Sequence, residues 1–295
     1  MALQKIVILA KPDGWHSQIL QAAFQRRGVI AEFALATDLQ VHLGGSPEVT
    51  SGQTCLTDAD LIIIREVPGG SLEQVIYRMD ALHQLENAGV RLINSPYAIE
   101  KMVDKYYALS LLESAGLQVP ETRLAETPSE AMAAFTALGE DVVLKPLFGS
   151  RGIGMVRLTD VENARRVFWA LQLGGYVYYL QKFIEHDNRD LRVLVMGGEC
   201  QAAMQRVSTI WKTNLAAGGH AEPFTLTEDM SSASLTAARV VGADYCGVDL
   251  MRDSKGELFV LEVNSMPAWQ GLQQVTPFDI SDRLVNHWLN SMPGR

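Results

Sequence analysis

The stretch CGVDLMRDSKGELFVLEVN, residues 246–264, predicts two antiparallel strands joined by a turn centred between Lys255 and Gly256. In that register Asp249 and Glu262 lie opposite one another on one face of the hairpin, and Asn264 follows on the same face. The residues that alternate with them are apolar and indicate a face that packs on a core: Val248, Leu250, Leu261 and Val263.

Two carboxylates that face one another across a ladder repel, unless a cation or a basic side chain lies between them. Asp249, Glu262 and Asn264 offer only oxygen ligands, which suit Mg²⁺, or Mn²⁺ in its place. Because Mg²⁺ takes few protein ligands and completes its shell with water and phosphates, this set indicates a site for a nucleoside triphosphate. The spacing alone leaves open the alternative of a solvated polar face on an amphipathic hairpin.

A glycine-rich stretch, KPLFGSRGIG at 145–154, lies between two predicted strands and should form a hairpin loop. It has neither the P-loop pattern nor the dinucleotide-binding pattern. Its glycines let backbone N–H groups approach phosphate oxygens, and Lys145 at the end of an apolar strand can add a point charge. A second loop, WKTNLAAGGH at 211–220, offers Lys212 and Asn214 to the same phosphates or cation. A plain turn or a solvated loop is the alternative in each case.

The rest of the chain is expected to divide into three parts. Near the N-terminus, strands alternate with helices, as in KIVILA (5–10) and the helix from Trp15 to Arg27, which indicates a small parallel α/β domain. Residues 42–57, rich in Gly, Ser, Pro and Thr, should form a loop within it. The expected domains are an α/β domain at 1–95, a central lobe with the glycine-rich loop at 96–180, and a C-terminal lobe with the metal site at 181–295.

Helix starts in the central part are predicted from capping patterns. One helical stretch should run from Ser95 through Leu112, and capping-box spacings predict further helix starts at Thr127 and Thr159.

The composition argues against several classes of protein. The 295 residues include 25 basic and 34 acidic ones, and the resulting net charge of −9 argues against nucleic-acid binding. The three cysteines, Cys55, Cys200 and Cys246, lie far apart without metal-ligand spacing, so a reduced, cytoplasmic setting is expected. No stretch approaches the roughly 18 to 20 apolar residues of a membrane span, and the first residues lack a signal-peptide core.

Five segments occur in a set order: VVLKPLFGSRGIGMV (142–156), QKFIEHDNRDLRVLV (181–195), TNLAAGGH (213–220), GVDL (247–250) and LEVNSMPAWQGLQ (261–273). Together they resemble the ATP-grasp superfamily, and within it the RimK-type glutamate ligases. The resemblance covers residues from about 95 to 285. It implies an α/β (α+β) fold of the ATP-grasp type, in which a small N-terminal parallel α/β domain precedes two α+β lobes that clamp ATP.

The resemblance also assigns roles. Asp249, Glu262 and Asn264 match the metal ligands of the family, while Lys145 and Arg192 match groups that stabilise the transferred phosphoryl group. The implied nucleotide-binding residues are Lys105, Lys145, Gly149, Ser150, Gly152, Gly154, Lys182, Phe183, Asp190, Lys212 and Asn214.

Some of these positions depart from the pattern of the family. Lys182 and Phe183 fall where the family hydrogen-bonds adenine through its backbone, although the family often has an acidic residue at 182. Trp269 replaces a small residue of the NASPG pattern and is expected to shape the acceptor pocket. Two arginines complete the candidate substrate contacts: Arg65, at the end of the LIIIR strand, and Arg206. For Arg65 a surface strand-end arginine is the alternative.

The implied activity is that of an ATP-dependent carboxylate–amine ligase that forms an amide bond through an acyl phosphate. Its expected partners are ATP, an amino acid such as L-glutamate, and a carboxylate acceptor on a small-molecule cofactor or a protein or peptide terminus. Three alternatives stay open: a ligase of amino-acid biosynthesis, a ligase that forms dipeptides, and a nucleotide-binding module without turnover. Whether the chain forms a homo-oligomer stays open as well.

Overall fold

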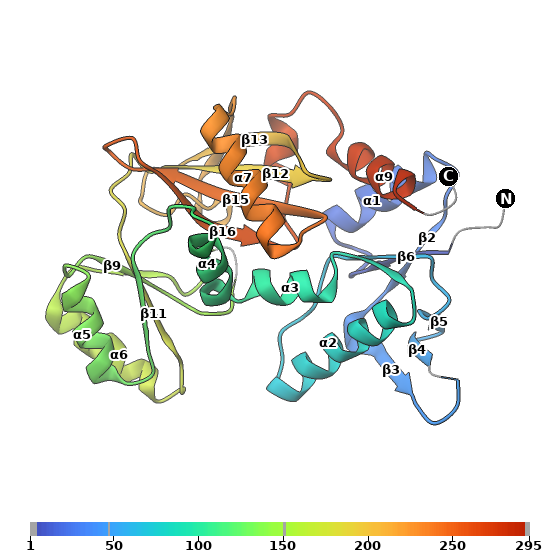
Figure 1. Cartoon of the computed structure of the whole chain (residues 1–295), viewed down its shortest axis with the longest axis horizontal. Helices are drawn as coiled ribbons and strands as arrows, with labels where there is room; N and C mark the ends of the chain where they lie inside the picture. Colours follow the sequence, from blue (N-terminus) through green and yellow to red (C-terminus); the bar gives the residue numbers. More distant parts are fainter. Residues whose placement is uncertain (1–4, 47, 150–151, 293–295) are drawn as a thin grey trace.

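The computed structural model of the chain describes residues 5–46, 48–149 and 152–292 (Figure 1). The first of its sheets is parallel, with the strand order β2-β1-β6-β7. Both faces of this sheet are buried, since Ile6 and Ile8 pack in one core cluster with Leu20 of α1, and Val7 packs in another with Leu82 of α2. The parallel sheet expected near the N-terminus is confirmed. Its elements are β1 (Ile6–Leu9), α1 (Trp15–Gln25), β2 (Ala31–Ala34), β6 (Leu61–Ile64), α2 (Leu72–Asn87) and β7 (Arg91–Ile93).

The segment 42–57, expected to be a loop, belongs to a small antiparallel sheet of β3 (Leu39–His42), β4 (Glu48–Ser51) and β5 (Thr54–Cys55). The prediction was wrong because the turn-forming residues there connect very short strands. Val49 is buried, and the Ser51 side chain hydrogen-bonds both the N–H and the carbonyl of Leu35, so this sheet is fixed to the parallel one.

The central lobe begins with two helices where one was expected. The helical stretch breaks at Asp104, whose extended backbone ends α3 (Pro96–Val103) and whose carboxylate caps α4 (Lys105–Ser114). The cap predicted at Thr127 is present, but the one predicted at Thr159 is made by Asp160. Helices α5 (Pro128–Ala137) and α6 (Val161–Gln172) pack on an antiparallel sheet, order β10-β9-β11-β8, of β8 (Thr122–Ala125), β9 (Val142–Lys145), β10 (Val156–Leu158) and β11 (Tyr178–Lys182).

The third part is a five-stranded antiparallel sheet in the order β14-β13-β12-β15-β16. One face packs on α4 and α7, while parts of the other face carry charged side chains. The elements are β12 (Arg189–Met196), β13 (Glu199–Val207), β14 (His220–Pro223), α7 (Glu228–Val241), β15 (Tyr245–Arg252), β16 (Leu258–Asn264), α8 (Gln270–Gln274) and α9 (Ile280–Asn290), with short 3-10 turns at Ala36–Asp38 and Leu215–Ala217.

The first and the last α-helix of the described residues pack together. Helix α9 lies against α1, and Arg27 of the loop after α1 pairs with Asp282 of α9 at 2.8 Å (Figure 1). The buried Asn94 side chain, just after β7, donates to the carbonyls of Tyr245 and Ser265 at 2.9 and 2.8 Å. These bonds fix the ends of β15 and β16 against the parallel sheet.

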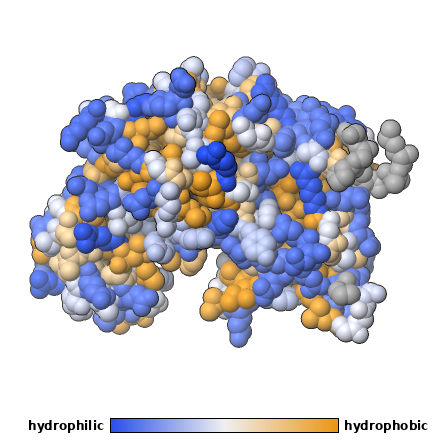
Figure 2. All heavy atoms as spheres, in the orientation of Figure 1, coloured by the Kyte–Doolittle hydropathy of each residue, from blue (hydrophilic) through white to orange (hydrophobic). Residues whose placement is uncertain are grey.

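In the space-filling view a notch separates the lobe of α5 and α6 from the region of α2 (Figure 2). Across the described residues, no helix is long and apolar enough to cross a membrane.

Candidate active site

The β15/β16 hairpin has the expected register at its functional end. Asp249 pairs with Glu262 and Gly247 pairs with Asn264, so both carboxylates and the amide lie on one face. A bulge after Asp249 shifts the rest of the ladder by one residue, and Leu250 therefore pairs with Val260. This corrects the expected core, because the buried Val260 takes the place assigned to Leu261, which is only partly buried.

Asp249 is held by two arginines of the same sheet, one from β12 and one from β13. Arg192, its partner across the β12/β15 ladder, donates through Nε to Oδ1 and through Nη2 to Oδ2, the latter at 2.8 Å. Arg206 of β13 places Nη2 3.0 Å from Oδ2 and also forms a two-pronged pair with Asp190, with Nε 2.7 Å from Oδ1. Burial opposes the charge of Asp249, but the two arginines outweigh it and keep its pKa below the ordinary value.

Glu262 is in a different electrostatic position. Its side chain is 30% exposed, and its nearest cation is Lys105 at the start of α4, with Nζ 3.8 Å from Oε1. Burial raises the pKa of Glu262 above its ordinary value, and Asp249 opposite adds to the increase, while Lys105 and Lys145 oppose it. Lys105 also donates to the carbonyl of Gly149 at 2.6 Å, so it joins the acidic hairpin to the glycine-rich loop.

Lys145, at the end of β9, is fixed by a glutamine that sequence reasoning missed. Its Nζ donates to Oε1 of the buried Gln181 at 2.5 Å, and Nε2 of Gln181 donates to the hydroxyls of Thr122 and Tyr179 at 3.0 and 3.3 Å. Burial lowers the pKa of Lys145 to about 8, against the raising effect of Glu262. Gln181 opens the QKFI segment quoted above, but nothing in the sequence shows that its side chain faces Lys145.

The two loops named from the sequence contact one another. Lys212 Nζ donates to the carbonyl of Met155 at 2.7 Å, and a Cβ added to Gly152 would lie 2.5 Å from Oδ1 of Asn214. Gly152 has φ +70°, and Gly154 has φ +79°, both in the left-handed region that favours glycine. Ser150, also predicted here, lies outside the described residues.

At the expected adenine position, the backbone N–H groups of Lys182 and Phe183 are already used. They donate to the carbonyls of Glu121 and Asp141 at 2.8 and 2.9 Å. Only the carbonyls of these two residues are left for a base. The Phe183 ring is covered by the guanidinium of Arg157, 3.4 Å from the ring centroid.

The predicted substrate residues lie in two places. Arg206 is buried in the ion-pair network of Asp249, whereas Arg65 follows β6 and stacks on Trp269, with the guanidinium carbon 4.6 Å from the ring centroid. Trp269 is fully buried, and its backbone N–H donates to His16 at 3.0 Å. We had expected Trp269 to shape an acceptor pocket, but its side chain has no exposed surface with which to line one.

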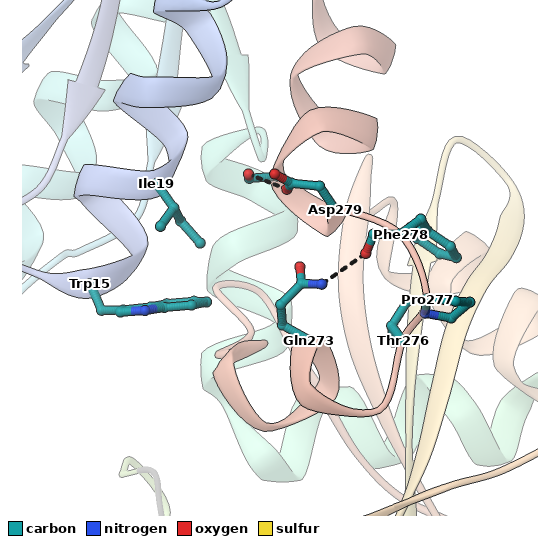
Figure 3. A pocket seen from close by; sticks show the side chains of 8 residues that line it. Trp15, Ile19, Gln273, Thr276, Pro277, Phe278 and Asp279 are labelled. Atoms are coloured by element: carbon teal, nitrogen blue, oxygen red, sulfur yellow. Dashed lines mark hydrogen bonds between the residues drawn. The ribbon is translucent and has the colours of Figure 1, made fainter.

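A pocket of about 260 Å³ opens between α1 and the segment before α9 (Figure 3). Its lining residues are Trp15, Ile19, Gln273, Thr276, Pro277, Phe278, Asp279 and Ser281. The main polar groups there are satisfied internally, since Gln273 donates to the carbonyl of Phe278 at 2.8 Å and Asp279 caps α9. None of the residues predicted from the sequence lines this pocket.

A parallel sheet followed by two antiparallel sheets is the arrangement of the ATP-grasp fold. The model of the RimK-like ATP-grasp domain matches residues 102–288, and the chain belongs to that family. A tetrahydromethanopterin:alpha-L-glutamate ligase of Methanosarcina acetivorans is 30% identical, with 90% of this chain and 92% of the relative covered. A probable alpha-L-glutamate ligase of an Enterobacter species is also 30% identical, over 98% of this chain and 97% of the relative.

Solved structures show the same fold. The ATP-grasp ligase PsnB in complex with a minimal precursor has a TM-score of 0.77 and 20% identity, over 98% of this chain and 99% of PsnB. Another PsnB structure, bound to Mg and ADP, has a TM-score of 0.73 and 21% identity, over 97% of this chain and 98% of PsnB. The family uses ATP, and the chain is therefore an enzyme that forms carbon–nitrogen bonds at the expense of ATP.

Proposed function

We propose that this ligase converts a carboxylate into an acyl phosphate and couples it to the amino group of an amino acid, which we take to be L-glutamate. The observation that carries the proposal is the pairing of Asp249 with Glu262, with Lys105 3.8 Å from Glu262 and both carboxylates influencing the pKa of Lys145. The glutamate ligases among the relatives support the choice of amino acid.

The donor set fits Mg²⁺ or Mn²⁺. Three N–H contacts from Arg192 and Arg206 occupy the oxygens of Asp249, and a carboxylate has about four acceptor sites, so one remains for a cation. Asn264 donates through Nδ2 to the carbonyl of Gly247 at 3.3 Å, which leaves its Oδ1 as the free acceptor. Asp249, Glu262 and Asn264 would hold the ion, which neutralises charge on the nucleotide phosphates when it is bound.

The basic groups have distinct tasks in the phosphoryl transfer. A carboxylate is a poor electrophile because its oxygen is a poor leaving group, and phosphorylation supplies a better one. Lys145 places a positive charge against the phosphates, and Arg192, oriented by Asp249, stabilises the charge that develops on the transferred group. A carboxylate oxygen attacks the γ-phosphorus of ATP and ADP leaves, which gives the acyl phosphate. The amine then attacks the acyl carbon, inorganic phosphate leaves with the bonding electrons, and the amine proton is released to solvent.

The nucleotide would lie between the central lobe and the acidic hairpin. We assign its phosphates to Lys105, Lys145, the glycine-rich loop around Gly149, Gly152 and Gly154, and the Lys212 and Asn214 loop, and its base to the carbonyls of Lys182 and Phe183. Asp190 and Arg206 bind one another and Asp249, so we assign them a positioning role in place of the nucleotide and substrate contacts expected from the sequence.

The formal charge of −9 disfavours long-range attraction of a strongly acidic protein tail, which favours a small-molecule carboxylate as the acceptor. The free cysteines support a reducing, cytoplasmic setting.

The test is a product screen. The protein is incubated with Mg·ATP, the twenty amino acids and a panel of carboxylates, and ADP, AMP and product mass are measured. We expect ADP and an amide as products. When hydroxylamine replaces the amino acid, we expect it to trap the activated carboxylate as a hydroxamate. Release of AMP and pyrophosphate in place of ADP would exclude the acyl phosphate intermediate. The variant Glu262→Gln serves as the inactive control.

A further inference from the structure

Among the residues that the structure describes, Arg65 is a cation without an anionic partner. Within the described part of the chain it forms no ion pair, since Nη1 donates to the hydroxyl of Tyr245 at 2.8 Å and Nη2 to the carbonyl of Pro267 at 3.0 Å. Its Nε is buried and has no acceptor, and the same holds for Nε1 of Trp269, on whose ring the guanidinium stacks. A partly buried guanidinium bonded only to neutral acceptors keeps a strong attraction for an anion.

The position of Arg65 connects it to the end of the acidic hairpin. Pro267, its carbonyl partner, lies three residues after Asn264. A Cβ added to Gly247 would lie 2.9 Å from Pro267 Cβ and 3.1 Å from Arg192 Cδ, so only a bare glycine separates these two side chains. Arg65 is thus linked through Pro267 and Gly247 to Arg192, one of the groups assigned to the phosphoryl transfer.

Arg65 is also held rigidly. Trp269 supports the flat side of the guanidinium and is itself fixed by the bond from its backbone N–H to His16 at 3.0 Å. Tyr245 and Pro267 fix the two Nη atoms. An arginine oriented in this way offers its remaining N–H groups to a carboxylate without a large loss of side-chain entropy.

We propose that Arg65 binds a carboxylate of the amine-donating amino acid and thereby makes the ligase select amino acids over simple amines. The inference rests on the proposed ligase function. The carboxylate to be phosphorylated must lie beside Lys145 and Arg192, which already supply its counter-charge. The second anion of the reaction is the carboxylate that the amino acid keeps, and Arg65 offers it a fixed guanidinium that is bonded only to neutral acceptors.

The test compares Arg65→Gln with the wild type under saturating Mg·ATP, with L-glutamate as the varied probe. We expect the KM for L-glutamate to rise about 10- to 100-fold while the KM for ATP changes less than about twofold. Isoglutamine lacks the charge of the α-carboxylate, and glutamine lacks the charge of the γ-carboxylate. Comparing the KM values of these two amides with that of L-glutamate shows which carboxylate Arg65 binds. The wild type should discriminate against one of the two amides, and Arg65→Gln should lose that discrimination.

Two further variants separate recognition from folding. Arg91→Gln is the matched control, because Arg91 begins the neighbouring strand β7 but pairs with Asp244 at 3.4 Å, and it should leave the acid-to-amide preference unchanged. Tyr245→Phe removes one anchor of Arg65 while keeping the buried ring, and it should raise the KM for L-glutamate by a smaller factor. If Arg65→Gln does not fold, Tyr245→Phe carries the test.

Binding in the presence of Mg and the non-hydrolysable analogue AMPPNP makes the result independent of turnover. An unchanged affinity for L-glutamate in Arg65→Gln, or no carboxylate-dependent binding of any of the twenty amino acids to the wild type, would overturn the inference. If amide product forms but Arg65→Gln keeps the wild-type preference, the ligase function stands and this role of Arg65 fails. If carboxylate-dependent binding that needs Arg65 is found without any amide product, the role of Arg65 stands and the ligase function fails.

Discussion

Asp249→Asn and Glu262→Gln are the same chemical change on opposite sides of one ladder, yet they should affect stability differently. Asp249 is 5% exposed and lies against two arginines, so the amide would leave the buried guanidinium of Arg206 and the partly buried one of Arg192 facing a neutral side chain. Breaking a buried ion pair from one side costs about 3 to 5 kcal/mol, and Asn keeps one acceptor oxygen, so we expect the lower end, about 3 kcal/mol. For a chain of 295 residues that corresponds to a fall in Tm of about 5 °C.

Glu262→Gln should change the stability by less than about 1 kcal/mol, because Glu262 is 30% exposed and its ion pair with Lys105 is long, at 3.8 Å. The sign follows from the pKa. A carboxyl group whose folded-state pKa is raised favours folding in its protonated form, so its ionisation near pH 7 opposes the folded state, and glutamine removes that cost. Asp249 has a lowered pKa, so the stability it contributes is present above its unfolded-state pKa and is lost as pH falls through its folded-state pKa.

The assay is urea and thermal unfolding at pH 7 without metal or nucleotide, together with ADP release under saturating substrates. Both variants should lose at least about 100-fold in turnover, since both remove a charged ligand of the proposed ion. Glu257→Gln is the control, because Glu257 lies at the exposed turn of the same hairpin. The reasoning is refuted if Glu262→Gln destabilises the protein as much as Asp249→Asn, or if either variant keeps wild-type turnover.

Three further predictions concern the nucleotide side. With Lys145 at a pKa of about 8, kcat/KM for ATP should fall as pH rises through about 8, because the ammonium is lost; a profile flat to pH 9.5 would contradict this. Gln181→Leu removes the acceptor of Lys145 Nζ and should shift that alkaline limb to lower pH and raise the KM for ATP severalfold, as measured by steady-state kinetics. Gly152→Ala would place Cβ 2.5 Å from Oδ1 of Asn214 on a backbone with φ +70°, so nucleotide affinity by calorimetry should fall about tenfold with little change in Tm.

The hairpin could be predicted from the sequence because its information is local. Alternation places Asp249 and Glu262 on the polar face of their strands. The pairs nearest the turn are one residue out of the register predicted from a turn between Lys255 and Gly256, and the bulge after Asp249 restores the predicted pair of Asp249 with Glu262. The bulge after Asp249 could not be predicted, since it adds a residue without leaving a composition signal, and it exchanged Leu261 for Val260 in the core.

The arginine network lay beyond sequence reasoning for a different reason. Arg192 and Asp249 are 57 residues apart, and Arg206 and Asp190 are 16 apart, so their contacts depend on the register of β12 against two partner strands. Periodicity gives the face of each strand but not this register. The break at Asp104 was missed because the helix propensity of its neighbours continues through it, and only the tertiary fold decides that Asp104 ends one helix and caps the next.

The two acids of the site therefore differ in what holds them. Asp249 is kept ionised by arginines that belong to the same sheet, whereas Glu262 depends on Lys105 of the central lobe, which also binds the carbonyl of Gly149 in the glycine-rich loop. A cation bound at Glu262 would repel Lys105, and the phosphates of the nucleotide would offer that lysine a new partner. The phosphates would therefore relieve the repulsion between the cation and Lys105, and the cation would replace Lys105 as the partner of Glu262. Two ligands that relieve each other's cost in this way bind with positive coupling. Because Lys105 also holds the loop, the same exchange would change the position of the loop when both ligands are bound.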